Sequence, residues 1–208
     1  MIKIMGLIAA AVLLTAAIAP AARADSTAFV ASPLYTIIGS GPVNLGMVFT
    51  ANSNITVDAL GYFDIFDSYG IIVAPATVAI YDSSGNLLSS TVVSPGSPVV
   101  DGYFYQAITP INLTAGNQYT VDEFSSDGNW AYSFGAPLTT DPDITYNYFD
   151  YVSSGSLEFP TNTAGLGPYF GPDFFFTQTS TVPEPSTLFL FFTGLLGVAG
   201  AARKRYLT

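Results

Sequence analysis

The sequence contains no cysteine and no histidine. These absences exclude disulfide frameworks, thiol nucleophiles, zinc sites built from nitrogen and sulfur ligands, and acid-base catalysis by imidazole. Basic residues are also scarce, with five Lys and Arg against 15 Asp and Glu in 208 residues. Most familiar enzyme chemistries need at least one of the groups that are missing or scarce here.

The basic residues lie only near the two ends of the chain. Two lie within the first 24 residues and three near the end, namely Lys3, Arg23, Arg203, Lys204 and Arg205. Residues 25–182 therefore contain no base, while they hold 14 of the 15 acids, a side-chain charge of −14. Because nucleic-acid binding depends on cationic side chains that displace phosphate counterions, DNA and RNA are excluded as direct partners.

The N-terminus has the three parts of a secretory signal peptide. Lys3 precedes an apolar run from Ile4 to Ala19, and the small residues Ala22 and Ala24 follow it in an A-x-A arrangement. This order predicts a signal peptide over residues 1–24, cleaved by signal peptidase after Ala24. A buried N-terminal helix is the alternative, although the run is not amphipathic.

The C-terminus reads as a membrane segment with a motif in front of it. From Pro185 to Ala202 the chain has 18 uncharged residues, about 27 Å as a helix, which just spans a hydrocarbon core. We expect a transmembrane helix over residues 186–202. The following Arg203-Lys204-Arg205 predicts a cytoplasmic stop by the positive-inside rule, with residues 25–182 on the outer side.

Residues 182–208, with Pro183-Glu184-Pro185, the apolar run and the basic end, resemble the PEP-CTERM sorting signal of Gram-negative bacteria. The resemblance implies recognition of Pro183, Glu184 and Pro185 by an exosortase, cleavage near the motif, and release or attachment at the cell surface. It also implies an association with exopolysaccharide and biofilm, because this sorting system accompanies exopolysaccharide production. The alternative is an ordinary single-pass anchor that is never processed.

Between the two signals, the sequence predicts one all-β exported domain over residues 25–181, built as an antiparallel β-sandwich or jelly roll. Turn residues separate short runs of β-branched and aromatic residues. The expected strands are 45–50, 55–63, 76–81, 87–93, 103–109, 118–124, 130–134, 145–152 and 173–178, with a hairpin loop at 82–86. Prolines, Pro110 among them, are expected at or outside strand ends.

Residues 43–134 resemble the DUF4082-type β-sandwich domain of bacterial secreted and carbohydrate-associated proteins. The pieces that carry the resemblance are Leu45–Thr50, Val57–Phe63, Val78–Leu88 and Ile111–Tyr119. Residues 135–181 are interpreted as an aromatic-rich extension and linker. The resemblance brings no catalytic residues with it.

Three sets of residues are candidates for a site. The first is acidic, and a solvated acidic face is the alternative. Asp58, Asp64 and Asp67 near one strand end have the oxygen ligands that calcium prefers. Further acids lie around another strand end and in a loop, namely Asp122, Glu123 and Asp127, and Asp141 and Asp143. Trp130, Tyr146 and Tyr148 are candidates for stacking on a glycan, with core packing as the alternative. Tyr146 and Tyr148 are expected on one strand face.

A third set is a carboxylate pair for glycoside hydrolysis. Asp122 and Glu123 are adjacent, so in a strand they point to opposite faces, which argues against that pair. Ice binding is a further alternative, but the Thr residues between 161 and 181 are few for a flat array. Without bases, carboxylates are expected to repel one another, which would raise their pKa values and favour folding at lower pH.

The sequence therefore predicts an exported, non-enzymatic surface or matrix protein without a cofactor, unless calcium binds. A carbohydrate-binding module and a carboxylate-pair hydrolase are the competing classes. Because the domain would repel an anionic polysaccharide, a glycan partner is expected to be neutral or bridged by divalent cations.

Overall fold

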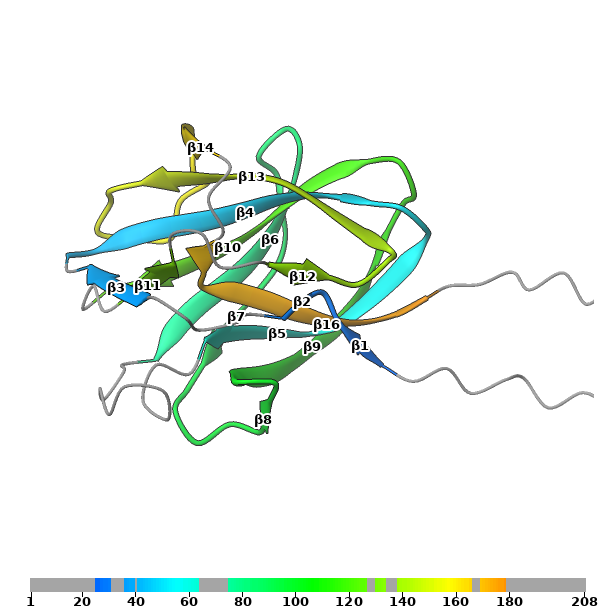
Figure 1. Ribbon diagram of the computed structural model, residues 1–208, viewed down its shortest axis with the longest axis horizontal. Coiled ribbons are helices and arrows are strands. Elements are labelled where there is room, and N and C mark those ends of the chain that lie inside the picture. Colours follow the sequence, from blue (N-terminus) through cyan, green and yellow to red (C-terminus); the bar gives the residue numbers. More distant parts are fainter. Residues whose placement is uncertain are drawn as a thin grey trace, which may run out of the picture.

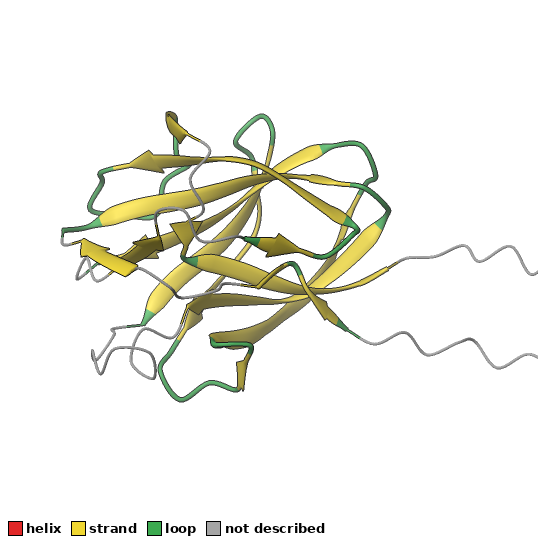
Figure 2. Ribbon diagram, viewed as in Figure 1, coloured by secondary structure: helices red, strands yellow, loops and turns green. Residues whose placement is uncertain are grey.

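All of the regular structure that the computed structural model describes is β-strand (Figure 2). The described residues are 25–30, 36–39, 41–63, 75–126, 130–133, 138–165 and 169–178. Within them the prediction of an all-β fold is confirmed. The signal-peptide helix and the transmembrane helix 186–202 were expected at positions outside these residues.

The strands are short to medium in length and follow one another closely along the chain. In chain order they are β1 (Ser26–Thr27), β2 (Phe29–Val30), β3 (Thr36–Gly39), β4 (Val43–Ala51), β5 (Ile55–Phe63), β6 (Ala76–Asp82), β7 (Leu87–Val93), β8 (Val99–Val100), β9 (Tyr103–Leu113), β10 (Gln118–Ser125), β11 (Trp130–Ser133), β12 (Thr139–Thr140), β13 (Ile144–Val152), β14 (Asn162–Gly165), β15 (Tyr169–Phe170) and β16 (Pro172–Gln178).

Two larger antiparallel sheets form the body of the domain (Figure 1). One has the strand order β14-β13-β4-β10-β6-β7, and the other has the order β1-β16-β5-β9-β8. Two smaller sheets, β15-β11-β3 and β12-β2, complete the described structure. The late strands β13 and β16 pair with β4 and β5, so the aromatic-rich region supplies strands to both large sheets.

The core lies between the two large sheets and receives apolar side chains from both. Phe49 of β4 and Phe174 of β16 have ring centroids 4.9 Å apart, and Phe29 meets both rings edge-on at 6.2 and 6.0 Å. All three rings are fully buried. The packing of two sheets over one aromatic and aliphatic core gives a sandwich-like fold.

The nine strands expected from the sequence are all present, most within one or two residues of their expected ends. The hairpin loop at 82–86 is also present. The Asp82 carboxylate accepts hydrogen bonds from the amides of Ser84 and Asn86 at 2.9 Å. Gly85 adopts the positive φ of 82° that this tight loop requires.

The expectation for Pro110 was wrong, because β9 continues through it to Leu113. The pairing of β9 with β5 is irregular between Val57 and Ala59, and Ile108, Thr109 and Pro110 fall in the stretch of β9 without a paired residue. On its other side β9 pairs with β8 only at Tyr103 and Phe104. A missing N-H at Pro110 therefore breaks no regular ladder.

The first and last strands of the described domain lie side by side. Ser26 pairs with Phe176 and Thr27 with Phe175, so β1 begins where β16 ends (Figure 1). The N-terminal segment is held further by hydrogen bonds from the amide of Ala28 to Phe174 O at 3.1 Å and from that of Phe29 to Asp173 Oδ1, also at 3.1 Å. The described domain therefore begins and ends at the same place, and both predicted processing sites lie outside the described residues.

Candidate functional site

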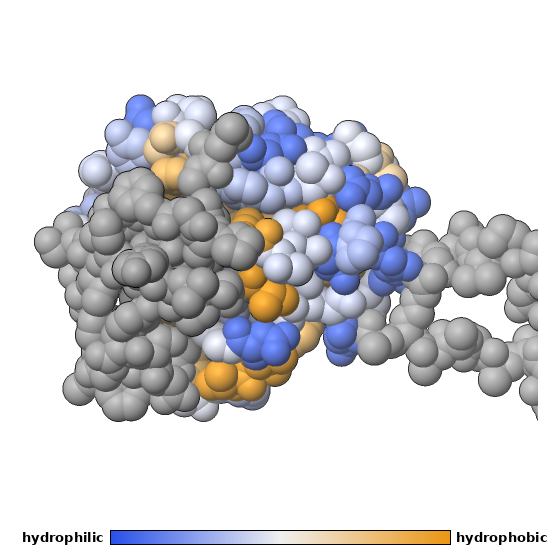
Figure 3. All heavy atoms as spheres, in the orientation of Figure 1, coloured by the Kyte–Doolittle hydropathy of each residue, from blue (hydrophilic) through white to orange (hydrophobic). Residues whose placement is uncertain are grey.

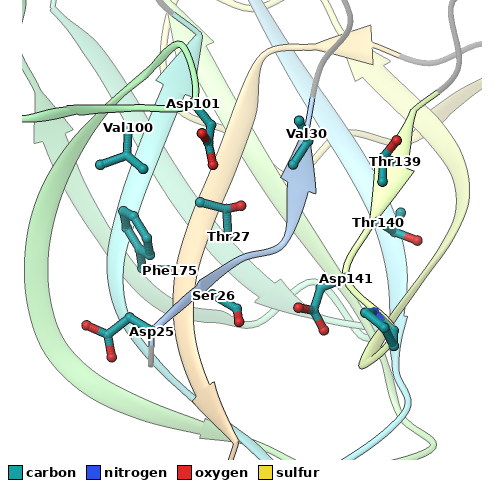
Figure 4. A pocket seen from close by; sticks show the side chains of 11 residues that line it. Asp25, Ser26, Thr27, Val30, Val100, Asp101, Thr139, Thr140, Asp141 and Phe175 are labelled. Carbon is teal, nitrogen blue, oxygen red and sulfur yellow. The ribbon is translucent and has the colours of Figure 1, made fainter. Parts of the chain in front are cut away.

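An open groove with three aspartates on its walls lies beside β1 (Figure 4). It has a volume of about 420 Å³, within the usual size range of small-molecule sites. Its acidic residues are Asp25, Asp101 and Asp141. We call this feature the acidic groove.

Local backbone structure positions two of the three aspartates. Asp101 and Gly102 form the two-residue turn between β8 and β9, and both have positive φ, 50° and 83°, as a type I′ hairpin requires. Asp141 accepts a hydrogen bond from the Asp143 amide at 2.9 Å, which fixes its carboxylate in a turn before β13. Figure 4 shows Asp101 and Asp141 on either side of β1, with Ser26 and Thr27 between them.

Apolar side chains complete the lining of the acidic groove. Val30 and Val100 are 39% and 38% exposed, and Phe175 packs its ring on Tyr105 with centroids 4.2 Å apart. Figure 3 shows hydrophobic and hydrophilic surface next to each other over this part of the molecule. The groove thus joins carboxylates, hydroxyls and a partly exposed apolar surface, a combination that suits a ligand with both polar and apolar faces.

A fully buried carboxyl, Asp173, lies near the start of β16 and bonds the N-terminal segment. Its Oδ1 accepts hydrogen bonds from the amides of Phe29 and Phe174 at 3.1 and 2.7 Å, and its Oδ2 accepts one from the Tyr105 hydroxyl at 2.5 Å. Burial raises the pKa of Asp173 to about 8, against the lowering effect of these hydrogen bonds. Asp173 therefore anchors the N-terminal segment to β16 and binds a proton at neutral pH.

A second buried group lies on the outer face of the six-stranded sheet, under residues 153–161, which we call the strap. Asn44 of β4 donates to Ser156 O at 3.0 Å and accepts from the Glu158 amide at 2.9 Å. Beneath the strap, the carboxyl of Asp122 is fully buried, and only the backbone of Leu45 and Glu123 lowers its pKa. Burial raises the pKa of Asp122 well above its ordinary value.

Burial, and not mutual repulsion, is the main cause of the raised pKa values. Four carboxyls have pKa values raised mainly by burial, namely Asp58, Asp122, Asp150 and Asp173. Repulsion from a neighbouring carboxyl comes second at Asp58 and Asp122. The expected direction of the shifts is present at these four carboxyls, and the predicted cause, repulsion, is the second cause at two of them.

The residues predicted for calcium are not brought together in the described structure. Asp58 lies in the irregular part of β5, while Asp64 and Asp67 lie outside the described residues. Within the residues that the structure describes, no three carboxylates gather in the way a metal ion requires. Calcium binding at these positions stays a prediction.

The glycan-contact prediction is changed by a bulge in β13. The register of β13 against β4 shifts between Tyr146 and Tyr148, with Asn147 as the extra residue. Tyr146 pairs with Phe49 and packs against the core, whereas Tyr148 pairs with Val48. The expectation that the two tyrosines share a face was therefore wrong, because one extra residue reverses the alternation.

The remaining residues predicted from the sequence are Trp130, Asp122 and Glu123. The backbone of Trp130 lies in β11, which pairs with β3 and β15. Asp122 and Glu123 are neighbours in the regular strand β10, so they point to opposite faces as predicted. The acidic groove itself was missed, because its parts come from residues 25–27, 30, 100–101, 139–142 and 175, which are far apart in the sequence.

Comparison with protein-family models assigns most of the chain. The model described as a domain of unknown function, DUF4082, matches residues 32–171. The chain belongs to the DUF4082 family. The match is longer than the stretch 43–134 in which the motifs were found, and it includes β13, the strap and β14 of the DUF4082 domain.

A second family model, the PEP-CTERM protein-sorting motif, matches residues 181–205. The match includes Pro183, Glu184 and Pro185 as well as Arg203, Lys204 and Arg205, so the suspected resemblance is confirmed. The motif indicates an exported protein that an exosortase sorts. The comparisons with curated proteins and with solved structures find no match.

The terminal signals lie outside the described residues, and so do the predicted cleavage residues Ala22 and Ala24. In the described part of the chain, no helix is long and apolar enough to cross a membrane.

Proposed function

We propose that this DUF4082 protein is a non-enzymatic surface or matrix protein that associates with extracellular polysaccharide after export. The observation that carries the proposal is the sorting motif at residues 181–205, which begins only a few residues after the last strand, β16, ends at Gln178. The motif directs the folded domain to the outer side of the cell, where polysaccharide is the surrounding material.

Two properties of the domain support a role without catalysis. No Lys, Arg or His occurs between residues 25 and 182, so no cationic side chain is available to stabilise a developing negative charge. The carboxyls with the largest pKa changes, Asp122 and Asp173, are fully buried, where a substrate does not reach them. A carboxylate-pair hydrolase is the competing proposal, and turnover of an oligosaccharide panel by the purified protein would establish it.

The carbohydrate-binding alternative has a specific location in the acidic groove. Its walls offer hydrogen-bond acceptors at Asp101 and Asp141, and its lining includes the partly exposed Phe175. Aromatic and aliphatic surfaces beside acceptors are the two components that recognition of a sugar ring uses. The groove is therefore the place where the proposed association with polysaccharide would occur.

The test of sorting is the intact mass of the protein recovered from the cell surface and from the medium. We expect loss of residues 1–24 and of the segment after the Pro-Glu-Pro motif. With Glu184→Ala the hydrophobic tail should be retained, while the cut after Ala24 is unchanged. A mass that keeps the tail in the unaltered protein would make this a membrane-tethered domain and remove the main support for the matrix role.

A further inference from the structure

The charges around the acidic groove favour a ligand that carries positive charge. In the exported region, residues 25–182, every charged side chain is an acid, and Asp25, Asp101 and Asp141 line the groove. An anionic ligand is repelled by these carboxylates and finds no cationic side chain to pair with. A ligand that brings donors, and above all positive charge, meets acceptors that are already fixed in place.

The apolar residues that line the groove favour a ligand that also has an apolar face. Val30 and Val100 are exposed apolar side chains that line the groove together with Phe175. The hydroxyl-bearing residues Ser26, Thr27 and Thr139 also line the groove. A small hydrated metal ion would leave the apolar lining uncovered, whereas a pyranose ring presents a C-H face, hydroxyl edges and a charged substituent where it has one.

We propose that the acidic groove binds the positively charged amino-sugar units of an extracellular polysaccharide. The inference rests on the proposed function and narrows it, since it names the class of glycan. The ammonium group of such a sugar donates charge-assisted hydrogen bonds to Asp101 or Asp141, and the ring lies on Val100 and Phe175. A polysaccharide with several amino-sugar units would also be attracted by the negative charge of the whole domain.

The mature N-terminus reduces this attraction but does not reverse it. Cleavage after Ala24 would give Asp25 a free α-ammonium group, the first positive charge in the exported region. One positive charge offsets one of the three carboxylates of the groove. Asp101 and Asp141, which β8, β9 and the turn before β13 position, keep their net negative charge.

The test is a calorimetric titration of the processed protein with two hexasaccharides of equal length, one of glucosamine and one of N-acetylglucosamine. Only the first carries ammonium groups. We expect the glucosamine hexamer to bind about tenfold more tightly or better at low ionic strength, as several exposed ion pairs together would give. This difference should shrink as salt is added.

The variants Asp101→Asn and Asp141→Asn test the location of the binding site. Asparagine tolerates the positive φ at position 101, and at position 141 its carbonyl oxygen can still accept from the Asp143 amide. Each change should weaken glucosamine binding by about two- to fivefold, the range of an exposed ion pair. The matched control is Glu158→Gln, which removes one charge from the exposed Glu158 on the strap, outside the groove, and should leave the affinity within a factor of two.

The possible results separate this inference from the proposed function. Equal binding of both hexasaccharides would overturn the amino-sugar assignment and leave the association with polysaccharide standing. An equal loss with Glu158→Gln would show attraction by net charge without the groove and would also overturn it. If neither hexasaccharide binds, nor the polysaccharide purified from the producing cells, the proposed function fails with it.

Discussion

At the scale of single residues, burial gives similar aspartates very different chemistry. Asp82 is partly exposed at the end of β6, and hydrogen bonds from Asn86 lower its pKa. Asp173 is enclosed by the core, and burial raises its pKa to about 8. The two residues differ in whether their carboxyls are charged at neutral pH, and no local sequence pattern distinguishes them.

Asp173 should make the stability of the domain fall as the pH rises. Its pKa is about 8 in the folded state and about 4 in an unfolded chain. Between these values the folded state holds a proton that the unfolded state releases, so the free energy of unfolding is greatest below pH 4 and decreases toward pH 8. The slope for one such group is about 1.4 kcal/mol per pH unit.

The variant Asp173→Asn should remove this slope. The Asn carbonyl can still accept from the amides of Phe29 and Phe174, and the uncharged side chain does not titrate. Chemical unfolding at pH 5, 6, 7 and 8 measures the effect, and a residual slope from Asp122 is expected. Asp82→Asn is the control and should leave the slope between pH 5 and 8 unchanged. An Asp173→Asn protein with the original slope would contradict the assignment.

Gly46 is the position where the strap approaches the sheet most closely. A Cβ atom at Gly46 would lie 2.5 Å from Pro160 Cγ and 2.8 Å from Thr120 Cγ2. Gly46→Ala should therefore lower the free energy of unfolding by about 1–3 kcal/mol, as other overpacked sites do. Gly155→Ala provides the comparison, since a Cβ there would have no atom within 4 Å. Thermal melts that show equal stability for both variants would exclude a tight strap contact.

At the scale of elements, alternation and turn signals were enough to find the long strands. β5 and β7 have the predicted bounds, because their ends are marked by polar and turn residues on both sides. None of the two-residue strands was predicted, since two residues carry no periodicity. Among them are β1, β2, β8 and β12. These short strands border the acidic groove, which is why the sequence did not reveal it.

Irregularities within strands were also beyond the sequence. The bulge at Asn147 and the continuation of β9 through Pro110 depend on which partner strand lies alongside. Both change which side chains share a face. The expectation that Tyr146 and Tyr148 share one face was wrong for this reason, although both residues are in the predicted strand.

The strap depends on Asn44, a polar side chain in an otherwise apolar strand end. Its side chain is fully buried and bonds the strap at Ser156 and Glu158. Asn44→Ala should cost about 1–3 kcal/mol, because both strap groups lose their partner. It should also speed proteolytic cleavage within residues 153–161, which mass spectrometry of the fragments would locate.

Asn112→Ala is the matched control for that variant. Asn112 accepts one exposed hydrogen bond from Thr56 Oγ1 at 2.8 Å, and exposed sites of this kind usually change stability by less than about 0.5 kcal/mol. If Asn44→Ala leaves both stability and strap proteolysis at the level of Asn112→Ala, the strap is held by Phe159 and Pro160 alone.

At the scale of the whole molecule, two features matter: the first and last strands of the described domain lie side by side, and its charged side chains all have one sign. β1 and β16 are adjacent, so the described domain begins and ends at one place, and the cleavage sites predicted at Ala24 and near Glu184 lie outside the described residues. The sequence alone predicted the terminal signals, since each is a local pattern. It did not predict that the groove lies at the strand that connects to the first of them.

The formal side-chain charge of −14 without a compensating base should make the exported protein sensitive to ionic strength. Exposed carboxylates repel one another more in the folded state than in an expanded chain, and salt screens this repulsion within about 10 Å at 0.1 M. The melting temperature at pH 7 should therefore rise by a few degrees between about 10 mM and 0.5 M NaCl. At pH 4, where part of the carboxylates are protonated, the rise should be smaller. A melting temperature indifferent to salt at both pH values would show that the acids lie too far apart to repel.

Calcium and magnesium chloride, compared at equal ionic strength, test the predicted metal site. An equal effect of the two salts on the melting temperature indicates screening. A larger effect of calcium, lost in Asp58→Asn, would establish the predicted metal site.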